Sequence, residues 1–153
     1  MKLLIINGPN LNMLGIREPE IYGTKSYYEL SQELKLYANE FHIQLIIKQT
    51  NYEGKIIDLI HHAYFKRFDG IIINPGALTH YSYAIHDAIS SVNVPVVEVH
   101  LSDLTTRESF RQKSVISDVC CKTIIGKSYD GYFEAIDYFM KGDSNNVKSS
   151  TNW

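Results

Sequence analysis

Five short runs of β-type apolar residues alternate with segments of helical period along this chain, and this alternation is the strongest constraint on its fold. The expected strands cover residues 2–7, 43–48, 70–74, 94–100 and 120–125. Strands that are joined through helices form a parallel sheet covered on both faces, because such crossovers are right-handed. The predicted fold is therefore α/β and flavodoxin-like: a doubly wound, five-stranded parallel sheet of order 2-1-3-4-5.

The helical segments carry their own boundary signals. Ser26 and Glu29 have the spacing of a capping box, and apolar residues then continue at helical spacing to Phe41. The same period predicts further helices around residues 56–64, 81–88 and 132–140. We expect one domain over residues 1–141, and the polar composition of residues 142–153 predicts a disordered tail.

Charge and composition exclude several classes of partner. The net charge of -2 offers no general attraction for nucleic acid or for an anionic membrane. The first apolar run is too short for a signal peptide or a membrane span, so a cytoplasmic protein is expected. Cys120 and Cys121 are adjacent, which argues against a disulfide between them and favours core packing for at least one.

The segment from Gly8 to Gly23 has neither helical nor strand period, and loops of this length in a compact domain are usually functional. Its apolar residues can anchor it to the domain, and its polar residues can then be directed at a ligand. The anchors are Leu11, Met13, Leu14, Ile16 and Ile21, and the polar candidates are Asn10, Asn12, Arg17 and Tyr22. An Ω-loop that packs only for stability is the alternative.

Polar residues follow the three strands that would be central neighbours in this sheet. Asn10, Asn74 and His100 lie after the first, third and fourth strands, so the topology predicts that they converge. Glu98 lies two residues before His100, on the same face of the strand, and can orient the imidazole. This pair suits a general acid or base, and a structural ion pair is an equally good interpretation. Asn74 is also open to a purely structural role in a turn.

The segment after the fourth strand is a candidate anion site. Thr105 and Glu108 have capping-box spacing, which predicts a short helix with Arg107 and Arg111 on one face. Backbone N–H groups and Arg111 after Ser102 would suit a carboxylate or a phosphate. Ordinary capping chemistry explains the same residues.

Tyr22 and Arg17 give a more specific hypothesis. A tyrosine acts as a base only after losing its proton, and a guanidinium in a partly dry site stabilises the phenolate. The alternative is that Tyr22 anchors the loop beside an exposed arginine. The spacing of the six histidines fits no metal site, and no glycine-rich nucleotide motif follows the first strand, so neither metal nor cofactor is expected. The absence of a Gly-x-Ser-x-Gly elbow argues against a hydrolase of the α/β type.

Five blocks of sequence together closely resemble the type II 3-dehydroquinate dehydratase family. They are GPNLNMLGIREPEIYG at 8–23, NYEG at 51–54, IINPGALTH at 72–80, VEVHLS at 97–102 and RESFR at 107–111. The resemblance implies a hydro-lyase of the shikimate pathway that converts 3-dehydroquinate to 3-dehydroshikimate and water, by anti elimination through an enolate and without a cofactor.

The resemblance also implies roles for individual residues. The base would be Tyr22, activated by Arg17, and the acid would be His100, oriented by Glu98; Asn10 would help to stabilise the enolate. The substrate would be bound by Asn74, His80, Leu101, Ser102 and Arg111, and Asp87 would reach the site of a neighbouring subunit in a dodecamer of four trimers.

Some positions depart from the family pattern. Asp103 stands where asparagine is more usual and adds a carboxylate beside the expected anion site, whereas the unusual residues 120–121 and 127–129 lie in structural or peripheral positions. The rival hypothesis is a flavodoxin-like module that binds an anion without turning it over. The residues leave open whether the enzyme serves biosynthesis or quinate breakdown.

Overall fold

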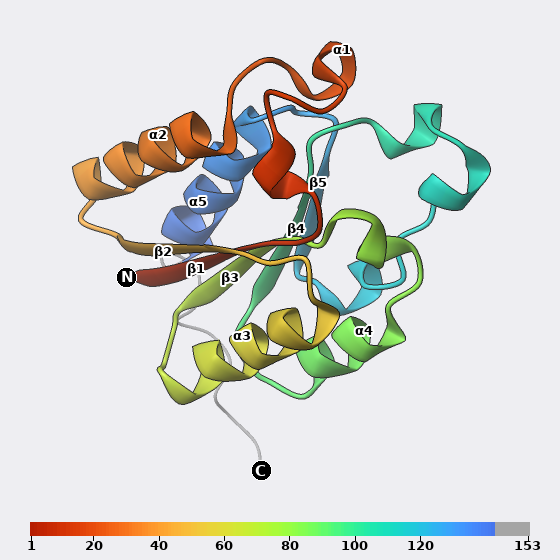
Figure 1. Ribbon diagram of the computed structural model, residues 1–153. Coiled ribbons are helices and arrows are strands. Elements are labelled where there is room, and N and C mark those ends of the chain that lie inside the picture. Colours follow the sequence, from red (N-terminus) through yellow and green to blue (C-terminus); the bar gives the residue numbers. More distant parts are fainter. Residues whose placement is uncertain (143–153) are drawn as a thin grey trace.

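The sheet has the predicted topology. The structure, a computed structural model, describes residues 1–142. Five parallel strands lie in the order β2-β1-β3-β4-β5 (Figure 1). Their bounds are β1 (Lys2–Asn7), β2 (Gln44–Gln49), β3 (Gly70–Asn74), β4 (Val96–His100) and β5 (Lys122–Ile125). The prediction of a flavodoxin-like α/β sheet is confirmed.

Helices cover both faces of this sheet (Figure 1). One face packs against α2 (Tyr27–Glu40) and α5 (Asp130–Gly142), and the other against α3 (Glu53–Phe65) and α4 (Tyr83–Ser90). The predicted capping box at the start of α2 is present, with Ser26 and Glu29 each accepting the other's backbone N–H. Within residues 1–142, no helix combines the length and the apolar character needed to cross a bilayer.

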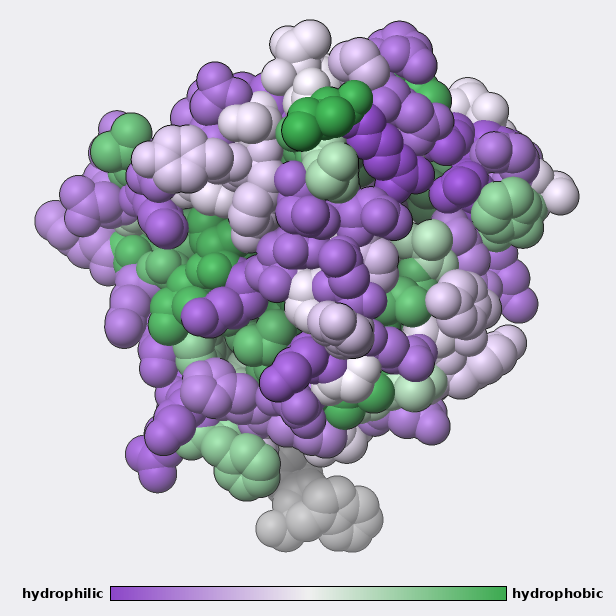
Figure 2. All heavy atoms as spheres, in the orientation of Figure 1, coloured by the Kyte–Doolittle hydropathy of each residue, from purple (hydrophilic) through white to green (hydrophobic). Residues whose placement is uncertain are grey.

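The central strands are apolar throughout because both of their faces are covered. In β1, Leu3 and Ile5 belong to the core under α2 and α5, whereas Leu4 and Ile6 belong to the core over α3 and α4. The edge strand β2 is different: it is half-buried to exposed, although its run of apolar residues resembles those of the buried strands. Figure 2 shows hydrophobic side chains at the surface there, between α2 and α3.

Two strands begin two residues later than predicted. β4 starts after Pro95, whose carbonyl accepts the backbone N–H of Ile71. β5 starts at Lys122, because Cys120 ends a 3-10 turn over Ser117–Val119. Cys120 is half-buried against the core and Cys121 is exposed, and both thiols are free.

The prediction of a short helix from the capping-box spacing of Thr105 and Glu108 is wrong. Two 3-10 turns replace it, over Leu104–Thr106 and Ser109–Arg111. Asp103 caps the first turn by accepting the backbone N–H of Thr105 at 2.9 Å, and Arg107 between the turns is extended. A side chain that bonds its own local backbone competes with helix formation, which explains the difference. At the C-terminus, α5 includes Gly142, and the predicted tail beyond it lies outside the described residues.

Gly8, where β1 enters the long loop, has no room for a side chain. Its N–H donates to the carbonyl of Asn74 at 2.7 Å, and a Cβ added there would lie 2.5 Å from the carbonyl oxygen of Pro75. We expect Gly8→Ala to lower the free energy of unfolding by about 1–3 kcal/mol, since two rigid backbone segments would have to separate.

The matched control for this prediction is Gly54→Ala in α3, where nothing lies within 4 Å of an added Cβ. That variant is expected to keep or gain stability, by up to about 1 kcal/mol, because alanine favours the helix. Thermal and urea unfolding would measure both variants. Equal stability of the two would contradict the close contact at Gly8.

Candidate active site

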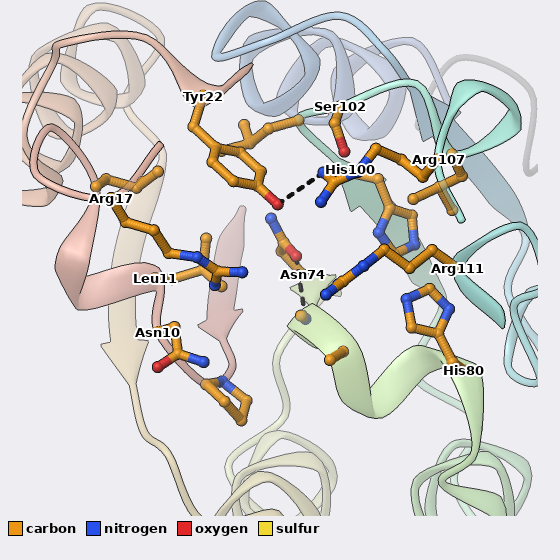
Figure 3. A pocket seen from close by; sticks show the side chains of 16 residues that line it. Asn10, Leu11, Arg17, Tyr22, Asn74, His80, His100, Ser102, Arg107 and Arg111 are labelled. Atoms are coloured by element: carbon orange, nitrogen blue, oxygen red, sulfur yellow. Dashed lines mark hydrogen bonds between the residues drawn. The ribbon is translucent and has the colours of Figure 1, made fainter. Parts of the chain in front are cut away.

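A pocket of about 190 Å³ lies beyond the carboxyl ends of β1, β3 and β4. Asn10, Asn74 and His100, which were predicted to converge from the topology, all line it (Figure 3). The predicted residues in its lining are Asn10, Arg17, Tyr22, Asn74, His80, His100, Leu101, Ser102 and Arg111. Arg107 also lines the pocket and was not predicted as a site residue. This volume is below the range typical of pockets for drug-sized ligands, so it suits a smaller organic molecule.

The loop over residues 8–23 closes one side of this pocket. Leu11 and Leu14 are buried and anchor it, as predicted, but Ile16 is 74% exposed and does not. Met13 and Ile21 are exposed too, which corrects the prediction that they are anchors. The loop contains a 3-10 turn over Leu11–Met13 and the four-residue helix α1 (Pro19–Tyr22), which places Tyr22 at the pocket.

Tyr22 lies between two guanidinium groups. Arg107 donates from Nη1 to the Tyr22 hydroxyl at 3.0 Å, across a separation of 85 residues in sequence (Figure 3). Arg17 was expected to be the partner of this tyrosine, but its Nε bonds Glu18 at 3.1 Å and its guanidinium lies 5.4 Å from the Tyr22 ring centre. The hydrogen bond with Tyr22 raises the pKa of the Arg107 guanidinium, so this group stays positively charged beside the hydroxyl.

The Glu98–His100 pair forms as predicted. Nε2 of His100 lies 2.6 Å from Oε1 of Glu98, and both side chains are buried. Burial by itself raises the pKa of the Glu98 carboxyl, but hydrogen bonds from His100, Thr79 and Ser114, with the positive charge of the imidazole, bring that pKa below its usual value. The carboxylate therefore stays ionised and fixes the orientation of the ring.

Asn74 has a structural role as well as a place in the pocket. Its Oδ1 accepts the backbone N–H of Gly76 at 3.2 Å, which is the predicted turn contact. Its Nδ2 donates to the hydroxyl of Tyr132 at 3.1 Å, and that hydroxyl donates in turn to Asn7. Tyr132 is fully buried in α5, so its hydroxyl fixes Asn74 and Asn7, at the ends of β3 and β1, from the helical layer that covers the sheet.

Opposite Arg17 and Tyr22, the pocket presents His80 and Arg111 (Figure 3). Nδ1 of His80 lies 2.7 Å from the carbonyl oxygen of Lys113. Nε of Arg111 is 3.1 Å from the carboxylate of Glu108 but lacks the alignment of a hydrogen bond, so the guanidinium retains donor capacity for an anion in the pocket.

Two predicted carboxylates lie away from the pocket. Asp103 is occupied with Thr105, whose hydrogen bonds lower the pKa of the carboxyl, and it is not part of the pocket lining. Asp87 is on α4, its side chain is 83% exposed, and its carboxylate lies 3.2 Å from Nδ1 of the neighbouring His86.

Sequence reasoning missed three contributors to this site. The spacing predicted that Arg107 lies beside Arg111, but the contact with Tyr22 was expected from Arg17 instead. Thr79 and Ser114 carried no signal, because single hydroxyls far apart in the sequence reveal nothing of a shared acceptor. The assembled site offers a tyrosine beside an arginine, a histidine held by a carboxylate and a guanidinium for an anion, which is a set suited to proton abstraction and donation.

Comparisons with known proteins agree on one family. Residues 1–140 match the family model described as Dehydroquinase class II. A 3-dehydroquinate dehydratase from Caldicellulosiruptor bescii is 53% identical over 140 residues, which is 92% of this chain and 96% of that protein.

Solved structures give the same result. The type II dehydroquinase from Butyrivibrio crossotus superposes with a TM-score of 0.90 at 50% identity, over 92% of this chain and 97% of its own. The type II dehydroquinase from Propionibacterium acnes has a TM-score of 0.88 at 38% identity, over 92% of this chain and 96% of its own.

Proposed function

Since the chain belongs to the class II dehydroquinase family and is a 3-dehydroquinate dehydratase, we propose that Tyr22 is its general base and His100 its general acid. The observation that carries this assignment is that both side chains line one pocket, each held by a charged partner of the sign its role requires. A guanidinium beside the Tyr22 hydroxyl can stabilise negative charge that develops on that oxygen, and the Glu98 carboxylate holds the His100 ring in one orientation.

The reaction then proceeds in two proton transfers. The Tyr22 phenolate removes a proton from the carbon beside the ketone, and the electron pair moves to the ketone oxygen to form an enolate. As the enolate collapses, the C–O bond to the hydroxyl breaks, and His100 donates a proton to the departing oxygen. The hydroxyl leaves as water, and a conjugated enone remains.

The other pocket residues bind the substrate. Arg111 and the backbone at Leu101 and Ser102 face the carboxylate of 3-dehydroquinate, while Asn74 and His80 bind its hydroxyls. Asn10 lies at the start of the loop and supports the enolate oxygen, directly or through water. The same reaction proceeds without metal or cofactor in this proposal, because an acid, a base and a stabilised enolate complete it.

The assembly proposed for this chain is the dodecamer of four trimers, with Asp87 reaching the site of a neighbouring subunit. Its exposure on α4, away from its own pocket, supports this role. Light scattering of the purified protein tests the assembly, and a monomer with full activity would overturn it. The cytoplasm is the proposed location.

The function itself is tested by the absorbance of the conjugated enone when purified protein is mixed with 3-dehydroquinate. Rising absorbance is expected. A flat trace from folded, assembled protein would leave a non-catalytic anion-binding module on the same fold.

Arg107 provides a prediction that separates the two arginines around Tyr22. We expect Arg107→Gln to lower kcat by about 10- to 100-fold, since a hydrogen bond to a charged group contributes about 1.5–3 kcal/mol. Steady-state assays of Arg107→Gln and Arg17→Gln side by side would measure this. Arg67→Gln is the control, because Arg67 lies in a separate surface groove beside Phe65 and Pro95 and should leave kcat unchanged. A loss no larger than that of the control would remove Arg107 from the activation of Tyr22.

A further inference from the structure

The carboxylate of Glu98 is fully buried and has more donors than orienting His100 requires. Oε1 receives the hydroxyl of Thr79 at 2.7 Å and that of Ser114 at 2.7 Å, as well as Nε2 of His100 at 2.6 Å. Within residues 1–142, Oε2 receives only the weaker contact from Thr123, at 3.3 Å. The donors therefore concentrate on the same oxygen that holds the imidazole.

These hydroxyls add to the contribution of the His100 imidazole in keeping the buried carboxyl ionised. A carboxylate moved out of water without donors takes up a proton, because burial disfavours the ionised form. A protonated Glu98 would no longer present a charged acceptor to Nε2 of His100. Hydroxyls on Oε1 offset that cost and also fix the oxygen in place, which in turn fixes the direction of the imidazole.

The two hydroxyls come from the segments that carry the substrate-binding groups. Thr79 directly precedes His80 in the 3-10 turn Gly76–His80, and Ser114 lies three residues after Arg111. The backbone joins these segments, because the N–H of Val115 donates to the carbonyl of Thr79 at 2.8 Å. In the described part of the chain, neither hydroxyl-bearing residue is among those that line the pocket.

We propose that Thr79 and Ser114 are positioning residues for the dehydration: their hydroxyls hold the buried Glu98 carboxylate, which holds His100 with its second ring nitrogen toward the pocket. This inference rests on the proposed role of His100 as general acid. Thr79 and Ser114 touch no reacting atom. Their hydroxyls lie 2.9 Å from each other and act on His100 through the carboxylate.

Thr79→Val is the cleanest test, since it removes the hydroxyl and keeps the shape of a fully buried side chain. We expect kcat to fall about 10-fold with KM within about twofold, because one hydrogen bond to the charged group is lost. Thr79→Ser restores the hydroxyl and should return kcat to near the wild-type value. Ser114→Ala should act in the same direction, although the Ser114 hydroxyl also accepts the N–H of Ile116 at 3.2 Å.

Thr123→Val is the matched control, because it removes a hydroxyl from Oε2, the oxygen that does not hold His100. Its kcat is expected to stay within about threefold of wild type, as the lost contact is long and weak. If Thr79→Val folds poorly, Thr79→Ser and Ser114→Ala still test the proposal, since one must keep the activity and the other must lose it.

A readout without substrate separates this proposal from the proposed function. The carbon-13 signal of the Glu98 carboxyl, followed against pH in the ligand-free protein, should titrate about one pH unit higher in Thr79→Val, a tenfold change in proton affinity. The other titratable groups facing it are His100 and Cys120; the pKa of the Cys120 thiol is raised by its own burial and by Glu98. Wild-type kcat in Thr79→Val with an unshifted carboxyl signal would overturn the proposal, as would a rise in KM alone. An inactive wild-type protein with the expected carboxyl shift would instead overturn the proposed function.

Discussion

Replacing Tyr22 by phenylalanine is expected to lower kcat by about 10²- to 10⁴-fold, which is the usual contribution of a positioned acid or base. The substitution removes only the hydroxyl that Arg107 contacts at 3.0 Å. The ring, which packs partly against the core under α2 and α5, remains. The fold and the pocket should therefore survive, and the enone absorbance in the presence of 3-dehydroquinate measures the loss.

The control for Tyr22→Phe is Tyr28→Phe, which removes the same hydroxyl from a side chain that is 70% exposed on α2. Its kcat should equal that of wild type. Enone formation at comparable rates in Tyr22→Phe and Tyr28→Phe would keep the reaction and assign the base to another group.

The second large effect is expected for His100→Gln, with kcat again lower by about 10²- to 10⁴-fold. A glutamine amide can donate to Glu98 in place of Nε2, so the buried carboxylate keeps a partner. The amide has no acidic proton to give to the departing hydroxyl. The loss of activity then reports the proton donor rather than a disrupted core. His62→Gln, at an exposed histidine on α3, is the control and should retain full activity.

Exchange of the substrate proton with deuterated solvent separates the two roles. His100→Gln should still form the enolate, so proton NMR should show exchange at the carbon beside the ketone without enone formation. Tyr22→Phe should show neither exchange nor enone. The reverse pattern would interchange the acid and the base.

The sequence by itself determined the sheet and the position of the pocket. Alternating strand and helix patterns leave few topologies open, because crossovers are right-handed and parallel strands end on one edge. The convergence of Asn10, Asn74 and His100 follows from that edge alone. Glu98 and His100 were also predictable as a pair, since residues two apart on a strand share a face.

Only the tertiary structure decided which polar groups meet inside the loops. The arginine beside the Tyr22 hydroxyl is Arg107, 85 residues away, although Arg17 is nearer in sequence. No helix follows the capping-box spacing at Thr105, because the N–H of Thr105 donates to Asp103 instead. Asn74 on β3 donates to the hydroxyl of Tyr132 on α5, which is 58 residues away in the sequence.

The physical reason for this division is the range of the forces involved. Periodicity and strand order are set by backbone geometry and by burial, which a local pattern of apolar residues records. A hydrogen bond between loops depends on where packing brings two side chains that are distant in the chain, and no local pattern encodes that meeting. The fold and the position of His100 on its strand could therefore be predicted from the sequence alone. The contact of Arg107 with Tyr22 and the hydroxyls around Glu98 could be identified only in the folded structure.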